Sequence, residues 1–367
     1  THLLINASTD DNPSDEKQKK KWFSRKKQTS SNTAQTTDVF EDEPPMQSTR
    51  QPLPEMTKRE WLLKAHSELV HDGDDPTKVY QIDVNKRLGK GGFGEVFQAT
   101  DLRSGEQVAI KKMQINQKNK MEYLLIETDL HARVSQHDHV VKFIDAFLLR
   151  DALEFWVVLE FVAGGPLNEF KHLPQFKEPH IAHCVKQVLS AIVYIHHTNR
   201  IHRDIKSANV LVAGDGNCKL TDFGLAAQLT TEFQERSTVL GTADFMAPEI
   251  IRRQKYGVKV DVWAMGMFVI ELGHRTTPFH GMPPKAVLDR LDAFGSPTLP
   301  TTGKGKKWSN DMKHFVAECL IMDVDKRPSA AKISRHKWFR RACEPSGMLP
   351  LIEKLREGGK GGGCVIQ

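Results

Sequence analysis

The period of the hydrophobic pattern changes once along the chain, and this change most limits the possible fold. Strand-like runs dominate the first half of the patterned region, at 79–88, 95–100, 107–113 and 154–161. Helical patterns dominate afterwards, around 180–197, 258–273 and 310–321. A strand-rich part followed by a helix-rich part predicts an α+β protein with two lobes.

Segments of different composition flank this pattern. Residues 1–55 are rich in Asp, Ser, Thr, Gln, Lys and Pro, so we expect disorder, because they bury too little apolar surface to offset the entropy of ordering. A short amphipathic pattern indicates a helical lead-in at 56–79. We therefore place one large domain at 80–339, followed by a tail at 340–367 that ends in a glycine-rich segment.

Composition argues against several classes of protein. The 367 residues carry a formal charge of +6, and much of this excess lies in one short run, as in a tail rather than a nucleic-acid-binding fold. No run approaches the ~18 apolar residues of a membrane-spanning helix, and no secretory signal is visible. The five cysteines have no paired spacing. We expect a cytoplasmic protein that binds no nucleic acid.

Three glycines, Gly89, Gly91 and Gly94, lie between two strand-like runs. Their G-x-G-x-x-G spacing also serves dinucleotide-binding folds, but there it opens a helix and an acidic residue follows about 20 positions later. Here a β-branched and aromatic strand follows at 95–100, which favours a hairpin that covers phosphates. A hairpin without a ligand is the alternative if these glycines are considered alone.

A lysine and a glutamate follow at a spacing that suggests an ion pair. Lys111 ends the run Val-Ala-Ile-Lys on a strand, where its ammonium group can neutralise the α- and β-phosphates of a nucleotide. Glu127 lies on the next helical stretch, and its carboxylate can fix the position of the lysine.

The strongest signal is a series of polar motifs in the helix-rich part: 201–209 (IHRDIKSAN), 222–224 (DFG) and 247–249 (APE). Phosphoryl transfer requires positioning and neutralisation of charge more than covalent help. Asp204 would accept the proton of a substrate hydroxyl, and Lys206 would steady the transferred group. Asn209 and Asp222 offer the hard oxygen ligands that Mg²⁺ prefers. ATP and Mg²⁺ are therefore the expected cofactors.

Together these motifs resemble the signature set of the eukaryotic protein kinases over about 80–339. The resemblance implies a two-lobed kinase fold with ATP in the cleft between the lobes. The lysine at position 206 is similar to that of serine/threonine kinases, since tyrosine kinases generally carry a different sequence there. Within the kinases, the chain looks most like the PAK group, on the segments IHRDIKSANVLV, KLTDFGLAAQLT, RSTVLGT, YGVKVDVWAMG and LEFVAGGPL.

The same resemblance assigns further residues. Leu159 would border the adenine pocket, and Glu160 and Val162 would supply backbone hydrogen bonds to the base. We count Val96 and Ala109 among the nucleotide-binding residues. The resemblance also implies an ion pair between Glu249 and Arg327, and contacts from Asp261 to the catalytic-loop backbone.

The chain departs from the PAK pattern at two places. Residues 241–249 read GTADFMAPE where the group usually has GTPYWMAPE, which changes the surface that receives the residue after the phosphoacceptor. Ala208 stands where PAK members often carry an acid that attracts basic substrates. Residues 1–79 hold no recognisable GTPase-binding motif, so the sequence does not support control by a small GTPase.

Thr238 lies between the DFG and APE motifs and is the predicted site of regulatory phosphorylation. A phosphate there would add a charge of about −1.5 to −2, which Arg203 could bind through charge-assisted hydrogen bonds. Ser237 is an alternative acceptor.

Two segments near the ends suggest contact with membranes. Residues 17–27 gather seven cations around two aromatic side chains. They can be a solvated tail, a nuclear-import or nucleic-acid-binding patch, or a surface for anionic lipids. The residues Cys364, Val365, Ile366 and Gln367 fit a C-terminal prenylation box, so we expect a lipid on Cys364 and a position at a membrane surface.

Three classes of function are compared. The leading hypothesis is an active serine/threonine kinase with protein substrates. A pseudokinase scaffold is the alternative, but Lys111, Glu127, Asp204, Asn209 and Asp222 are all present. An NAD-binding protein is disfavoured because neither the helix nor the later acidic partner of that motif follows the glycines.

Overall fold

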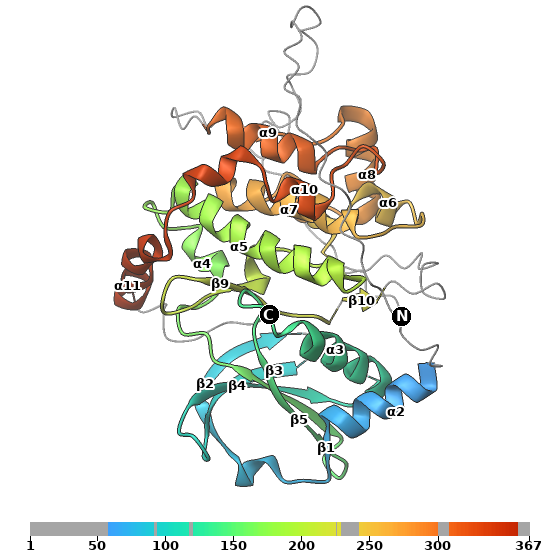
Figure 1. Ribbon diagram of the computed structural model, residues 1–367, viewed down its shortest axis with the longest axis vertical. Helices are drawn as coiled ribbons and strands as arrows, with labels where there is room; N and C mark the ends of the chain where they lie inside the picture. The colour runs from blue at the N-terminus through green and yellow to red at the C-terminus, as the bar shows by residue number, and fades with distance from the viewer. Residues whose placement is uncertain are drawn as a thin grey trace, which may run out of the picture.

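The computed structural model describes residues 58–91, 94–116, 120–224, 226–228, 242–299 and 308–358. A sheet-containing lobe and a helical lobe stack along the long axis of the molecule (Figure 1). The predicted α+β fold with two lobes is confirmed. No helix in the described part of the chain is long and apolar enough to span a bilayer.

The first lobe, or N-lobe, is built on a six-stranded sheet with the order β1-β5-β6-β4-β3-β2. Its strands are β1 (His71–Asp72), β2 (Tyr80–Gly91), β3 (Gly94–Asp101), β4 (Gln107–Gln114), β5 (Phe143–Leu149) and β6 (Glu154–Glu160). Its helices are α2 (Lys58–Leu69), η1 (Pro76–Lys78) and α3 (Met121–Val134). Four of the strands occupy the predicted strand-like runs.

The second lobe, or C-lobe, is mainly helical. Its helices are α4 (Leu167–Phe170), α5 (Glu178–His197), α6 (Pro248–Ile251), α7 (Lys259–His274), α8 (Pro284–Phe294), α9 (Asn310–Cys319), α10 (Ala330–Ile333) and α11 (Leu349–Glu357). The short 3-10 helices are η2 (Ser207–Asn209), η3 (Ala243–Phe245), η4 (Lys337–Arg341) and η5 (Pro345–Met348). Two small antiparallel pairs complete it: β7 (Arg200–Ile201) with β10 (Ala227–Gln228), and β8 (Val210–Val212) with β9 (Cys218–Leu220).

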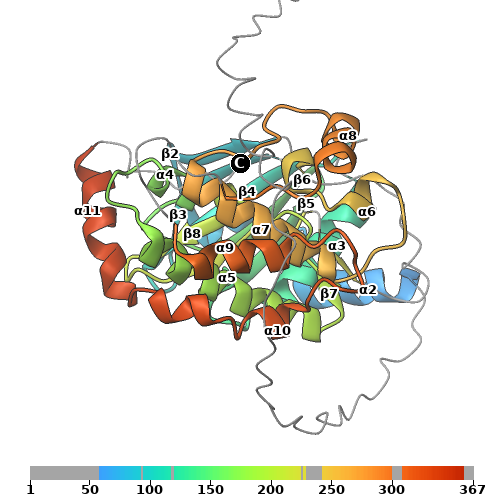
Figure 2. The same ribbon diagram turned by 90° about the horizontal axis from the view of Figure 1, so that it is seen from above.

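Helix α7 forms the centre of the C-lobe. All of its residues from Val260 to Leu272 are buried, as expected for a helix that is apolar on every side. Figure 2 shows it beside α5 and α9, the two helices that it contacts most. Gly266 lets α9 approach, because a Cβ there would lie 2.7 Å from the Leu320 side chain. Residues of α7 hold the backbone of the segment 202–209, which contains the predicted residues Asp204, Lys206 and Asn209.

The segments that flank the predicted domain are partly structured. The lead-in at 56–79 contains α2 as well as β1, which joins the sheet and is too short for a period to show in the sequence. In the tail at 340–367, α11 packs Leu351, Ile352 and Leu355 against the C-lobe core. The predicted disordered segment 1–55, Thr238 and Cys364 lie outside the described residues.

Candidate active site

A lysine and two carboxylates meet between the lobes. Lys111 Nζ on β4 lies 2.8 Å from Oε1 of Glu127 on α3 and 3.7 Å from Oδ1 of Asp222. Burial disfavours the charged ammonium group, but the two carboxylates outweigh this effect and hold the pKa of Lys111 above its usual value. The predicted pair is thus formed, and the lysine remains charged where phosphates would bind.

Strand register brings the predicted nucleotide-binding residues together. Gly89 faces Val96 across the β2–β3 pair, and Val96 faces Lys111 across β3–β4. Ala109 faces Leu159 across β4–β6. These residues belong to four adjacent strands, β6, β4, β3 and β2, so together they can cover one side of a nucleotide site. Among them, Val96, Ala109 and Leu159 are buried apolar groups suited to an adenine ring.

Gly94 is required by the backbone geometry of the hairpin. Its φ is 152°, and a Cβ on it would lie 2.0 Å from the carbonyl oxygen of Lys112 on β4. Any side chain would push β3 away from β4, and so away from Lys111. Gly91 pairs with Gly94 as the last pair of the hairpin, at the end opposite to Tyr80 and Asp101.

The end of β6 leads into the connection between the lobes. The backbone N–H of Glu160 already donates to the carbonyl of Lys142 at 3.0 Å. Of its two backbone groups, only the carbonyl can therefore form the predicted hydrogen bond to an adenine base. The carboxylate of Glu160 accepts from Lys219 Nζ at 2.8 Å, which ties the two lobes. Val162 is buried next to this point.

The segment 202–209, which carries Asp204, Lys206 and Asn209, is held by the start of α7. The fully buried carboxylate of Asp261 accepts hydrogen bonds from the backbone N–H groups of His202, at 2.9 Å, and Arg203, at 2.8 Å. His196 Nε2 lies 2.9 Å from the same carboxylate. Arg203 takes a left-handed φ of 69°, and the two hydrogen bonds stabilise this unfavourable conformation. The bracing role that the resemblance implied for Asp261 matches this geometry.

Asp204 lies at the centre of a tight polar cluster. Lys206 Nζ is 2.8 Å from Oδ2 of Asp204, and Asn209 Nδ2 donates to the same oxygen at 2.8 Å. The hydroxyl of Thr242 donates to Oδ1 of Asp204 at 3.0 Å, and Lys206 donates to that hydroxyl. Burial raises the pKa of Asp204, but Lys206 and Asn209 outweigh it, and the net shift is downward. The group is therefore a carboxylate at neutral pH and can accept a proton.

Asn209 and Asp222 fit the predicted metal site. With Nδ2 bound to Asp204, the buried Oδ1 of Asn209 has no hydrogen-bond partner among the described residues. An orphaned buried carbonyl oxygen is costly unless a ligand satisfies it. The Asp222 carboxylate offers the second hard oxygen, and its residue takes a left-handed φ of 64°. The pair fits Mg²⁺ by donor chemistry.

Three aromatic rings in contact connect this site to α3. Phe223 packs face to face with His131 of α3, with ring centroids 4.6 Å apart, and edge to face with His202 at 5.0 Å. Burial lowers the pKa of His131 to about 4, so its imidazole is neutral at physiological pH. Its Nε2 donates to the carbonyl of Val141 at 2.7 Å. The three packed rings thus link α3 to Phe223, the residue that follows Asp222, and to His202.

A second clamp on the segment 202–209 was not predicted from the sequence. Glu271, near the end of α7, accepts from the backbone N–H of Ser207 at 2.9 Å and also from the Ser207 hydroxyl. Nζ of Lys171, directly after α4, lies 2.6 Å from the Glu271 carboxylate. Thr242 was missed as well, because its contacts to Asp204 span 38 positions and no local pattern reports them. A threonine shortly before the APE motif was the available signal.

Of the two residues with a predicted regulatory role, Arg203 lies in the described part of the chain. The Arg203 guanidinium donates to the Tyr256 hydroxyl at 3.0 Å and to the Ala226 carbonyl at 3.3 Å, so it already touches the segment after Asp222. Its pairing with a phosphate on Thr238 stays a prediction. Further from the site, Arg327 forms a bidentate, buried ion pair with Glu249 at 2.7 and 3.1 Å.

One other cluster could suggest a metal: His314, Glu318 and His336. The backbone N–H of Trp338 donates to Nδ1 of His336 at 3.1 Å, so Nε2 of a neutral His336 carries the proton. That proton is directed at Nδ1 of His314, 2.9 Å away. The group is satisfied by hydrogen bonds and requires no ion.

Comparisons with known proteins agree with this geometry. Residues 82–339 match the family model described as protein kinase domain. The chain is 41% identical to serine/threonine-protein kinase pakC of Dictyostelium discoideum, over 77% of this chain and 58% of that protein. It is 38% identical to serine/threonine-protein kinase PAK 1 of Mus musculus, over 84% and 54% respectively. The chain thus spans little more than half the length of these relatives.

Proposed function

The chain belongs to the protein kinase family, and from this premise we propose that it is an active serine/threonine kinase that transfers the γ-phosphoryl group of ATP to hydroxyls of protein substrates. The observation that carries the proposal is the assembly around Asp204. A charged acceptor, a cation and a hydroxyl meet within 3.0 Å there. The orphaned Asn209 oxygen and the Lys111–Glu127 pair lie in the same site.

The proposed chemistry divides among the residues of the two lobes. Lys111, fixed by Glu127, would bind and orient the α- and β-phosphates. Asp204 would accept a hydrogen bond from the substrate hydroxyl, aim its oxygen, and take its proton during transfer. Lys206 would stabilise the charge that spreads over the transferred group. Asn209 and Asp222 would hold Mg²⁺, which neutralises phosphate oxygens when bound.

A pseudokinase scaffold remains the alternative. It is disfavoured because each of the five residues that would carry catalysis is both present and placed in contact with another member of the site. The test is phosphate transfer from labelled ATP to a degenerate library of serine and threonine peptides. Transfer above the level of a chain with Asp204→Asn supports the proposal. Nucleotide binding without transfer would favour the scaffold.

We further propose that Thr238 phosphorylation activates the enzyme through Arg203. Its support is the position of Arg203 between Asp204 and the segment after Asp222, with hydrogen bonds to Tyr256 and Ala226. Mass spectrometry of the active protein, with activity of Thr238→Ala and Thr238→Glu, tests it. Full activity without phosphate at this position would contradict the proposal.

We also propose membrane attachment through a lipid on Cys364, with residues 17–27 as a second, electrostatic contact to anionic lipids. A single lipid chain binds only marginally, and cations add roughly 1 kcal/mol each near an anionic surface. Cys364→Ser should release the protein from the membrane fraction. A soluble parent with an unmodified Cys364 would contradict this proposal and leave the kinase proposal intact.

A further inference from the structure

The segment before the family match is built into the N-lobe. Helix α2 precedes residue 82, where the match begins, and packs along α3 (Figure 1). Ala65 of α2 is 1% exposed. Leu62 and Val70 pack against the hydrophobic cluster that contains Leu124 and Leu125 of α3. The segment therefore shares a core with the helix that carries Glu127.

Strand β1 fixes the end of this segment to the sheet. His71 and Asp72 pair in parallel with Phe147 and Leu148 of β5, at the edge of the sheet. The N–H of Gly73 donates to the carbonyl of Leu148 at 3.2 Å. Asp72 also forms an ion pair with Arg150, and His66 Nε2 of α2 lies 3.3 Å from the same carboxylate. Asp72 thus joins α2 to the β5–β6 connection.

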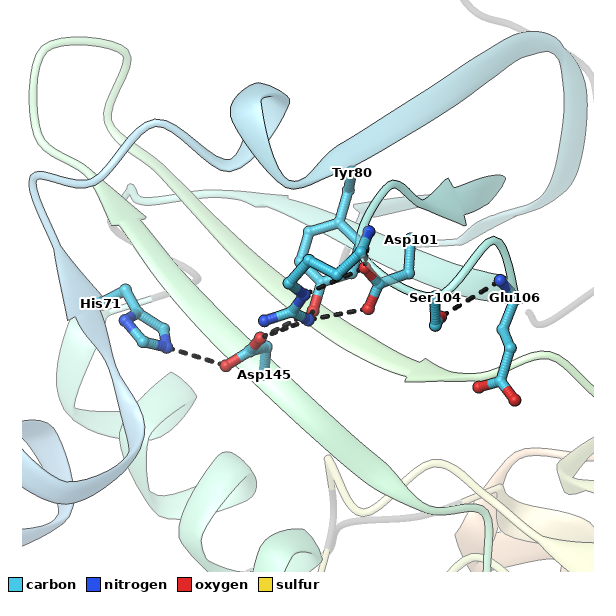
Figure 3. Close-up of polar contacts among 7 residues, drawn as sticks. His71, Tyr80, Asp101, Ser104, Glu106 and Asp145 are labelled. Atoms are coloured by element: carbon cyan, nitrogen blue, oxygen red, sulfur yellow. Dashed lines mark hydrogen bonds and ion pairs between the residues drawn. The ribbon is translucent and has the colours of Figure 1, made fainter.

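A polar network secures the same strand on its other side (Figure 3). His71 Nε2 lies 2.8 Å from Oδ1 of Asp145 on β5. The Tyr80 hydroxyl donates to Oδ2 of Asp145 at 2.6 Å, and Arg103 donates to that hydroxyl at 2.7 Å. The His71 ring also stacks on Phe147 at 4.9 Å. Asp145 therefore links β1, β2 and β5.

We propose that residues 58–79 act as a brace that holds α3 in the position where Glu127 reaches Lys111. The brace has two ends: the face of α2 that holds Leu62 and the buried Ala65, and Asp72 with His71 at the sheet. Its effect on phosphoryl transfer rests on the proposed kinase activity. Ala65 and Asp72 are positioning residues in this account, since they act through α3 and touch no substrate.

The test compares two substitutions on one helix of the full chain. Ala65→Glu places a charge at a buried position of α2, whereas Leu63→Glu places the same charge at a residue of α2 that is 63% exposed. We expect Ala65→Glu to displace α3 in most molecules, which should raise hydrogen exchange of the α3 amides at least tenfold and lower the rate of transfer about fivefold. Exchange in α7 and KM for the peptide should stay unchanged. Leu63→Glu should match the parent.

A double substitution separates positioning from general stability. If the brace acts through Glu127, adding Ala65→Glu to a Glu127→Gln chain should change the transfer rate by less than about twofold. An equal loss in both backgrounds, or parental α3 exchange in Ala65→Glu, would overturn the proposal.

Should Ala65→Glu unfold the lobe, Arg150→Ala decides the question, because this side chain is 68% exposed and only the tie to Asp72 is removed. We expect a two- to fivefold rise in α3 exchange; no rise would overturn the brace. If the variants raise α3 exchange but the parent transfers no phosphate, the proposed function alone is wrong. If the parent transfers phosphate and both variants show the same α3 exchange as the parent, the brace proposal alone is wrong.

Discussion

The hydroxyl of Thr242 donates a hydrogen bond to Oδ1 of Asp204 at 3.0 Å and accepts one from Lys206 at 3.0 Å. Thr242 stands at the start of the described segment that leads to Glu249, so this contact joins that segment to the proposed proton acceptor. The carboxylate of Asp204 is therefore oriented from three sides, by Lys206, Asn209 and Thr242.

Removing this hydroxyl should slow catalysis without unfolding the protein. Thr242→Val keeps the shape of the side chain but leaves Oδ1 of Asp204 without its donor. We expect kcat to fall about 10- to 100-fold. Steady-state kinetics on one serine peptide measures this, and Thr276→Val, at an exposed threonine, is the control. Unchanged kcat in Thr242→Val would show that the contact has no catalytic role.

His131 should make stability depend on pH. Above its unfolded pKa of 6.5 the ring is neutral in both states; between 6.5 and about 4 only the unfolded chain binds the proton. Stability should thus fall as pH falls through this window, by roughly 2–3 kcal/mol from this group. Urea unfolding from pH 7.5 to 4.5 measures the effect. His131→Leu should flatten the dependence relative to the parent and to His197→Leu, an exposed control; equal slopes in all three would contradict it.

The buried Glu249–Arg327 pair should be costly to break on one side. Both side chains are almost fully buried, and Arg327 also lies over the Trp263 ring at 5.1 Å. Arg327→Met leaves a buried carboxylate unpaired and should lower the free energy of unfolding by about 3–5 kcal/mol. Adding Glu249→Gln should recover part of that loss. Chemical denaturation of the single and double variants checks it, and a simple sum of losses would refute the coupling.

The sequence predicted the parts of the site that depend on local spacing. Lys111 and Glu127 are sixteen positions apart on a strand and the following helix, and their contact follows from that order. Asp204, Lys206 and Asn209 share one loop. Strand register then explains why Gly89, Val96 and Lys111 meet.

Contacts between distant segments were harder to predict. Glu271 binds Ser207 across 64 positions, and a glutamate near the end of a buried helix has no periodic signature. Strand β1 has two residues, too few for an alternation to appear. The departures at Ala243 and Asp244 were visible, but only the structure shows that Asp244 is buried and accepts from Thr277 at 2.6 Å.

The central claim is that Asp204 and Lys111 carry phosphoryl transfer. Its most direct test is single-turnover transfer of the γ-phosphoryl group from ATP to a serine peptide by the parent, Asp204→Asn and Lys111→Met. The account predicts transfer by the parent and a loss on the order of a thousandfold in each variant. Near-parental rates in both variants would contradict it.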